Sequence, residues 1–176
     1  CRGSDGVVAN CVVAGNKSEY RGSGILCDGG PVQITNLTIT GNRGPEDSEA
    51  LALGAHVMSV ANCIVWNNWP TQIVYYHTPI VSYCDVQGGW EGEGNIEVDS
   101  RFVEGGYWDA NGTPDDANDD FWVDGDYHLR ADSGCINAGD PNFAAGPNDT
   151  DIDGEPRVFA GRVDMGADEF TPLIKC

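Results

Sequence analysis

Basic residues are scarce in this chain: nine Lys and Arg stand against 28 Asp and Glu, which gives a formal net charge of −19. Nucleic acids and anionic membrane surfaces are both bound through basic faces. The charge balance therefore argues against both classes of partner, and it favours high solubility, cationic ligands or a calcium-rich extracellular setting. Long apolar runs are missing too, so we expect no insertion into a membrane. No signal peptide opens the chain, and we expect the numbered chain to be a mature or trimmed product.

What the chain does contain is a repeated stretch of the form V-x-N-C-x-V. Residues 8–13, 34–39, 60–65 and 81–86 follow it or vary it, and 26 residues separate the third position of each copy from the next among the first three copies. Repeats of this length indicate one supersecondary unit that is stacked on its own copies. A single unit cannot bury its apolar face alone, so the stack itself is the predicted fold.

Each copy predicts a strand, a bend and a second strand. Apolar or thiol residues occupy the first, fourth and sixth positions, and the gap of three between the first and fourth breaks the alternation of a single strand. A left-handed bend at the third position restores the alternation, and Asn tolerates those backbone angles. The predicted bends are Asn10, Asn36 and Asn62.

Stacking the copies about 4.8 Å apart, the spacing of strands in a sheet, places like residues in columns that face the core. A third strand per unit is expected at residues 24–27, 50–53 and 71–76. The sequence therefore predicts an all-β parallel solenoid. Its predicted core ladder consists of Val8, Ile34, Val60 and Val81, then Cys11, Leu37, Cys63 and Cys84, then Val13, Ile39, Val65 and Val86.

Two sets of motifs resemble a known family. G-I-L-C-D-G-G followed by I-T-N-L-T-I-T-G-N, within residues 24–42, resembles the right-handed parallel β-helix repeats of the pectin-lyase-like superfamily. The series at 84–96, 126–141, 149–157 and 163–170 resembles the C-terminal part of exported bacterial choice-of-anchor and β-helix repeat proteins. The resemblance departs at Asp-Ser-Arg-Phe (residues 99–102), where the family usually reads Asp-Pro-Leu-Phe.

The resemblance implies a right-handed β-helix and an extracellular or cell-surface location, but little about chemistry. We expect one domain, with the β-helix coils in residues 1–98. The acidic loop and a C-terminal capping region are expected in residues 99–176.

Seven cysteines are an odd number, so in an exported protein at least one thiol is free or pairs between chains. We expect the three thiols of the core ladder to act as small buried hydrophobes. Cys1 and Cys176 lie at the two ends of the chain. A head-to-tail stack would bring Cys176 of one copy next to Cys1 of the following copy, where the two could form an interchain disulfide. The alternatives are that each pairs locally, with Cys135 as the candidate partner, or stays free.

An acidic segment interrupts the pattern, with nine acidic residues and one basic residue between Asp99 and Asp126. Acids and amides around a Gly turn there resemble calcium loops, in which hard oxygens surround the ion. A second candidate loop follows near residue 150. The terminal bidentate Glu of an EF-hand is absent, and a solvated acidic loop over packed aromatic residues is the alternative. The candidate Ca²⁺ ligands are Asp109, Asn111, Asp115 and Asp116 in the first loop, and Asp149, Asp151 and Asp153 in the second.

Catalytic patterns are sparse. Glycoside hydrolases need carboxylates that face each other, and lyases of the resembled fold need a calcium cluster beside a basic residue. The predicted strands carry only isolated acids such as Asp28, Glu49 and Asp85, and the basic residues are scattered. These patterns favour a non-enzymatic protein over an enzyme.

We therefore expect an extracellular structural or adhesive protein. Open strand edges at the ends of a solenoid pair readily with other chains. Contacts between copies that do not close on themselves produce filaments, so the predicted partner is another copy, joined head to tail. The alternative is a carbohydrate-binding module, or a lyase- or hydrolase-like enzyme, that acts on polysaccharide.

Overall fold

The computed structural model describes residues 6–54 and 58–172. These residues form an all-β structure, with no helix long and apolar enough to cross a membrane among them. Nine strands form two parallel sheets: β1 (Gly6–Ala14), β2 (Ile25–Cys27), β3 (Val32–Thr40), β4 (Leu51–Leu53), β5 (Ser59–Ala61), β6 (Ile64–Trp66), β7 (Ile73–Tyr75), β8 (Ile80–Ser82) and β9 (Asp85–Val86). Four more strands follow: β10 (Phe102–Glu104), β11 (Tyr107–Asp109), β12 (Phe121–Val123) and β13 (Asp126–Leu129).

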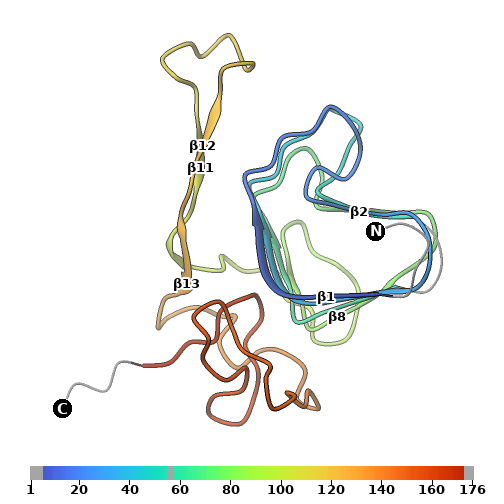
Figure 1. The fold of residues 1–176 in the computed structure, drawn as a ribbon, viewed down its shortest axis with the longest axis vertical. Coiled ribbons are helices and arrows are strands. Elements are labelled where there is room, and N and C mark those ends of the chain that lie inside the picture. The colour runs from blue at the N-terminus through green and yellow to red at the C-terminus, as the bar shows by residue number, and fades with distance from the viewer. Residues whose placement is uncertain (1–5, 55–57, 173–176) are drawn as a thin grey trace.

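The larger parallel sheet curls around a corner that the Asn bends make (Figure 1). Its strand order is β8-β5-β3-β6-β9, and β1 pairs with β3. The φ angles of Asn10, Asn36 and Asn62 are 55°, 54° and 54°, and Tyr83 takes the same conformation in the fourth copy with a φ of 52°. Each bend separates two strand segments of one copy, and each segment pairs with the matching segment of the next copy. The 26-residue repeat fixes the register of this pairing in the first three copies.

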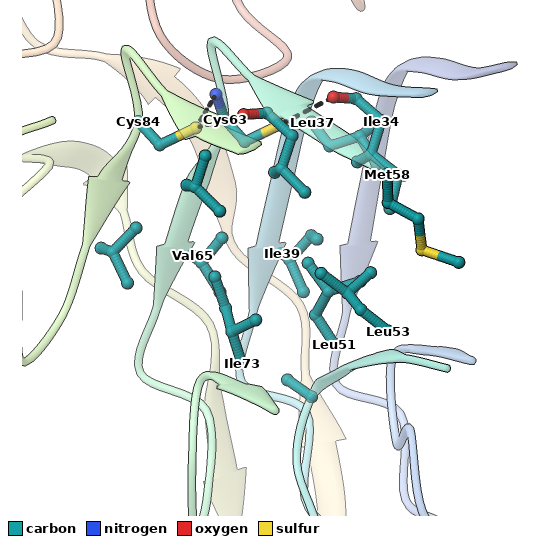
Figure 2. Close-up of a cluster of buried hydrophobic side chains, with 14 of the residues drawn as sticks. Ile34, Leu37, Ile39, Leu51, Leu53, Met58, Cys63, Val65, Ile73 and Cys84 are labelled. Carbon is teal, nitrogen blue, oxygen red and sulfur yellow. Dashed lines mark hydrogen bonds between the residues drawn. The ribbon is translucent and has the colours of Figure 1, made fainter. Parts of the chain in front are cut away.

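The second parallel sheet, β2-β4-β7, contains the predicted third strand of each repeat unit. Its register pairs Ile25 with Leu51 and Leu51 with Ile73. Side chains from both sheets meet in one core, which Figure 2 shows in part. Leu37 and Cys63, neighbours in the predicted ladder, are both fully buried. The ladder residues from β3 onward are buried: Ile34, Val60, Val81, Leu37, Cys63, Cys84, Ile39, Val65 and Val86.

The first copy differs from the others in burial. Cys11 is paired with Leu37 in register but is exposed, and Val8 and Val13 are only half-buried. Cys11 therefore occupies the predicted register position, but the prediction that it is buried in the core was wrong. The physical reason is that β1 has a paired neighbour on one side only, so its ladder residues lack the second layer that buries the copies after it.

The far end of the stack is covered by residues 88–98. Tyr83 N donates to Glu93 O at 2.7 Å, and Ile96 N donates to Cys84 O at 2.9 Å. Trp90 packs on the core and meets Tyr75 edge to face, with ring centroids 5.6 Å apart. This segment precedes Asp99, so the cover of this end lies before the region that the sequence predicted as the cap.

Residues 99–172 lie along the side of the curled sheet (Figure 1). Trp108 Nε1, in the β11–β12 hairpin, donates to Gly41 O at 2.7 Å, and Trp122 packs over Gly41. Farther along the chain, Ala167 N donates to Thr38 Oγ1 at 3.0 Å, although Thr38 lies in the middle strand of the sheet. A second apolar cluster joins Ile64 of the sheet to Leu129, Cys135 and Met165 of these loops and strands. The C-terminal region thus packs against the side of the larger parallel sheet.

Candidate functional site

The exposed edge of β1 is the first candidate site. This nine-residue strand pairs with β3 on one side, and no described strand pairs with its other side. In the last copy, Asp85 N donates to Cys63 O at 2.8 Å, so the N–H at this repeat position points toward the preceding strand. Val12 is the equivalent residue in the first copy, through the register that joins it to Asp85. Its N–H therefore points out of the open edge.

Asparagine ladders run along the stack and end at this edge. Asn42 Nδ2 donates to Asn68 Oδ1, and Asn16 Nδ2 donates to Asn42 Oδ1, each at 2.9 Å. Asn42 is fully buried, whereas Asn16 is exposed. A second ladder joins the bends, where Asn36 Nδ2 donates to Asn10 Oδ1 at 3.0 Å. Identical side chains hold successive copies in register up to β1.

The first predicted calcium loop joins β11 to β12, and its side chains bond to one another. Asp109 Oδ1 accepts from Asn111 N at 2.8 Å, and Asp116 Oδ1 accepts from Asn118 Nδ2 at 2.7 Å. Asp115 is exposed. Among the described residues, the group of three or more His, Cys, Asp and Glu side chains that could hold a metal ion lies elsewhere. Calcium binding by this loop stays a prediction.

The second predicted loop divides its three acids between different roles. Asp149 Oδ2 accepts from Gly146 N at 2.8 Å, and Asp151 is buried, with Oδ1 accepting from Glu155 N at 2.8 Å. Asp153 instead lies beside His128 and Asp168, and one ligand atom from each of these three residues lies within 4.8 Å of the others. Among the described residues, this is the group of three His, Cys, Asp or Glu side chains close enough together to hold a metal ion. The sequence pointed to Asp153 but gave no sign of its two companions.

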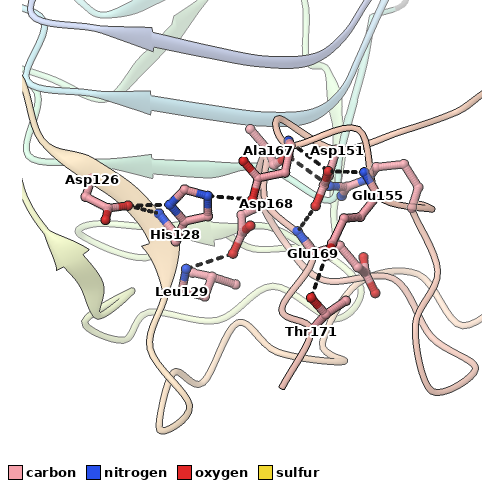
Figure 3. A network of polar contacts seen from close by, with 11 residues as sticks. Asp126, His128, Leu129, Asp151, Glu155, Ala167, Asp168, Glu169 and Thr171 are labelled. Carbon is pink, nitrogen blue, oxygen red and sulfur yellow. Dashed lines mark hydrogen bonds and ion pairs between the residues drawn. The ribbon is translucent and has the colours of Figure 1, made fainter. Parts of the chain in front are cut away.

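Electrostatics in this cluster follow from burial and close pairing. Hydrogen bonds from His128 to Asp126 and then to Asp153 raise the pKa of the imidazole to about 9, against a smaller opposing effect of burial. Burial raises the pKa of Asp168 to about 6 and that of Glu169 to about 7. Figure 3 shows Asp126 and His128 on β13, with Asp168 and Glu169 on a loop beside them. The site concentrates negative charge that one imidazole only partly balances.

A buried arginine organises the loop that carries Asp168. Arg157 is fully buried, and its guanidinium donates to the carbonyl oxygens of Ala167 and Gly166, both at 3.0 Å. Burial lowers its pKa, and the carboxylates around it, with Glu169 the strongest influence, act in the opposite direction. Arg157 therefore fixes the backbone on which Asp168 is placed.

The described cysteines are all free thiols. Cys63 N lies 3.4 Å from Cys84 Sγ, and burial raises the pKa of the Cys84 thiol well above its ordinary value. Cys135, a candidate for disulfide pairing, is instead a fully buried free thiol 3.4 Å from Asp85 Oδ2. The second apolar cluster encloses the Cys135 sulfur, and its pairing with either end of the chain stays a prediction. Cys1 and Cys176 lie outside the described residues.

Comparisons of the chain with protein-family models, curated proteins and solved structures found no match.

Proposed function

We propose that this chain is a non-enzymatic extracellular structural or adhesive protein, built as a right-handed parallel β-helix, whose copies associate through the edge of β1. The two parallel sheets with a 26-residue repeat, left-handed Asn bends and Asn ladders support the β-helix. The exposed edge of β1 is the observation that carries the function. Association by such an edge needs no catalytic group and uses main-chain hydrogen bonds.

The composition of β1 favours pairing with another strand. Natural sheets protect edges with charges, prolines or bulges, whereas β1 reads G-V-V-A-N-C-V-V-A and contains no charged residue or proline. Val7 is 65% exposed, which adds apolar surface at the same edge. Two copies can meet here without opposing like charges, although the whole chain carries a formal net charge of −19.

We propose that β1 of one copy pairs with β1 of another copy. Head-to-tail growth, as expected from the sequence, requires a free far end to receive β1, and residues 88–98 cover that end. Pairing of two β1 edges about a two-fold axis needs no such rearrangement and closes on itself. A dimer of β1 edges is therefore the arrangement that the geometry favours over an open filament.

Sedimentation velocity over a range of concentrations, in reductant throughout, tests the proposal. The wild-type chain should form a dimer as concentration rises. Val12→Pro removes the outward N–H and should leave a monomer, whereas the matched control Val12→Thr keeps the N–H and should still dimerise. A wild-type chain that stays monomeric would overturn the proposal. If the wild-type chain forms filaments and Val12→Pro does not, the β1 edge is the interface but the copies are arranged head to tail and not as a two-fold dimer.

A second candidate function, binding of a neutral oligosaccharide, is favoured by one cleft whose lining includes an exposed tyrosine. It measures about 440 Å³ and is lined in part by Tyr20, Arg21 and Asp47. Tyr20 is 77% exposed, and the Arg21 guanidinium lies 4.5 Å from the ring centroid of Tyr76. The acids in the lining disfavour an acidic polysaccharide. Loss of binding to neutral glycans in Tyr20→Ala, with Tyr107→Ala as the exposed control, would support this function, and unchanged binding would reject it.

A further inference from the structure

Three segments of the C-terminal region bring one nitrogen donor and two carboxylates to a single cleft. His128 comes from β13 and Asp168 from a loop beside it (Figure 3). Asp153 comes from a separate loop. One ligand atom from each lies within 4.8 Å of the others. The three side chains line a cleft of about 310 Å³, and Glu155 and Glu169 add two more carboxylates to its lining.

We propose that His128, Asp153 and Asp168 bind one divalent transition-metal ion of the zinc type, through His128 Nε2 and one oxygen of each carboxylate. Calcium and magnesium prefer all-oxygen ligand sets, whereas an imidazole beside carboxylates suits zinc and its neighbours in the first transition row. The site is independent of the proposed association through β1.

Asp126 is the positioning residue for the imidazole. Its Oδ1 is hydrogen-bonded to His128 Nδ1, while His128 Nε2 lies 2.8 Å from Asp153 Oδ2. In zinc proteins a carboxylate commonly accepts the second ring N–H of a ligating His, which fixes the tautomer and presents the other nitrogen to the metal. The metal would take the place of the proton between Nε2 and Asp153.

The geometry requires only a modest adjustment. Zinc bonds of about 2.0–2.2 Å in a tetrahedral site place ligand atoms roughly 3.4 Å apart. Asp168 is held in place, because it is 4% exposed and its Oδ2 accepts from Leu129 N at 2.8 Å. The Asp153 side chain is 51% exposed and can turn toward the ion. The fourth coordination position would face the cleft and take a water molecule.

Such an ion would link three segments that no described disulfide joins. His128 is on a strand that pairs with β10, Asp153 follows a loop anchored by buried Asp151, and Asp168 is on the loop held by Arg157. Binding that requires the folded arrangement stabilises it by mass action. A metal here therefore stabilises the C-terminal region in its packed position against the larger parallel sheet.

The test uses the full chain, freed of metal with a chelator that is then removed. Co²⁺ absorption and Zn²⁺ calorimetry should both report one ion per chain, and Zn²⁺ should raise the melting temperature. His128→Gln and Asp153→Asn should each weaken binding by more than about tenfold, and Asp126→Asn by about 10–100-fold. His77→Gln is the control for the imidazole. Asp132→Asn is the control for the carboxylate, since the Asp132 side chain is 52% exposed, almost the same as that of Asp153.

The controls should bind as wild type does, and a large excess of Ca²⁺ should not displace Zn²⁺. If His128→Gln fails to fold, as judged by circular dichroism, the exposed Asp153→Asn substitution still decides the question. Absence of stoichiometric binding, binding unchanged in Asp153→Asn, or an equal loss in Asp132→Asn would overturn the proposal.

Discussion

Replacing Asn42 with Ala should be among the more costly single changes in the stack, because this side chain joins three successive copies. Its Nδ2 donates to Val13 O at 2.9 Å, to Thr40 O at 3.2 Å and to Asn68 Oδ1 at 2.9 Å. Its Oδ1 accepts from Asn16 N at 3.1 Å and from Asn16 Nδ2 at 2.9 Å. All of these bonds disappear in Asn42→Ala, and the site is fully buried.

The magnitude follows from the number of bonds. The two hydrogens of the amide serve three acceptors, so four bonds are a fair count, and each has a net value of about 0.5–1.5 kcal/mol. We expect Asn42→Ala to reduce the free energy of unfolding by about 3–4 kcal/mol. For a chain of this length that corresponds to a melting temperature lower by roughly 6–16 °C.

Asn16→Ala is the matched control at the open end of the same ladder. Its Nδ2 donates to Ala14 O at 3.2 Å and to Asn42 Oδ1, and the side chain is exposed, so we expect a loss of about 1 kcal/mol or less. Urea unfolding followed by circular dichroism measures both variants. Equal losses in the two variants would refute the view that the buried ladder holds the copies together.

Two other predictions concern the C-terminal region. Gly41→Ala should displace the hairpin, because Gly41 has a φ of 64° and an added Cβ would lie 1.9 Å from Trp122; a shifted tryptophan emission spectrum should report it, and an unchanged spectrum would contradict the packing. Burial raises the pKa of Asp85, so the folded protein holds that proton more tightly than the unfolded chain and this contribution to stability is lost as pH rises through the raised pKa. Asp85→Asn should therefore gain stability relative to wild type as the pH rises above about 4; a difference from wild type that is constant with pH would contradict the assignment.

The repeated half of the fold was predictable because its physics is periodic. Asn at the third position of each copy indicated the bends, and like residues at 26-residue intervals indicated the register, for example Ile34 with Val60. Burial at the end of the stack was not predictable from the pattern, since Cys11 and Leu37 occupy the same repeat position but differ in the number of neighbouring strands.

The contacts within the C-terminal region could not be predicted in this way, because its sequence contains no repeat that relates one segment to another. His128, Asp153 and Asp168 come together through turns and through a buried arginine, not through a repeated spacing. The acidic loop at 149–153 was a usable signal for one of these residues. The packing of Trp122 over Gly41 had no signal in the sequence, because it joins residues far apart through their shapes.

Amide hydrogen exchange at Val12 and Ala14 tests the proposed association most directly, since the repeat register points both N–H groups out of the β1 edge. If copies associate through this edge, these amides exchange quickly in dilute protein and become protected as concentration rises, while the buried strand β3 is protected throughout. Fast exchange at both positions at every concentration would show that the edge stays unpaired, and it would contradict the association of copies through β1.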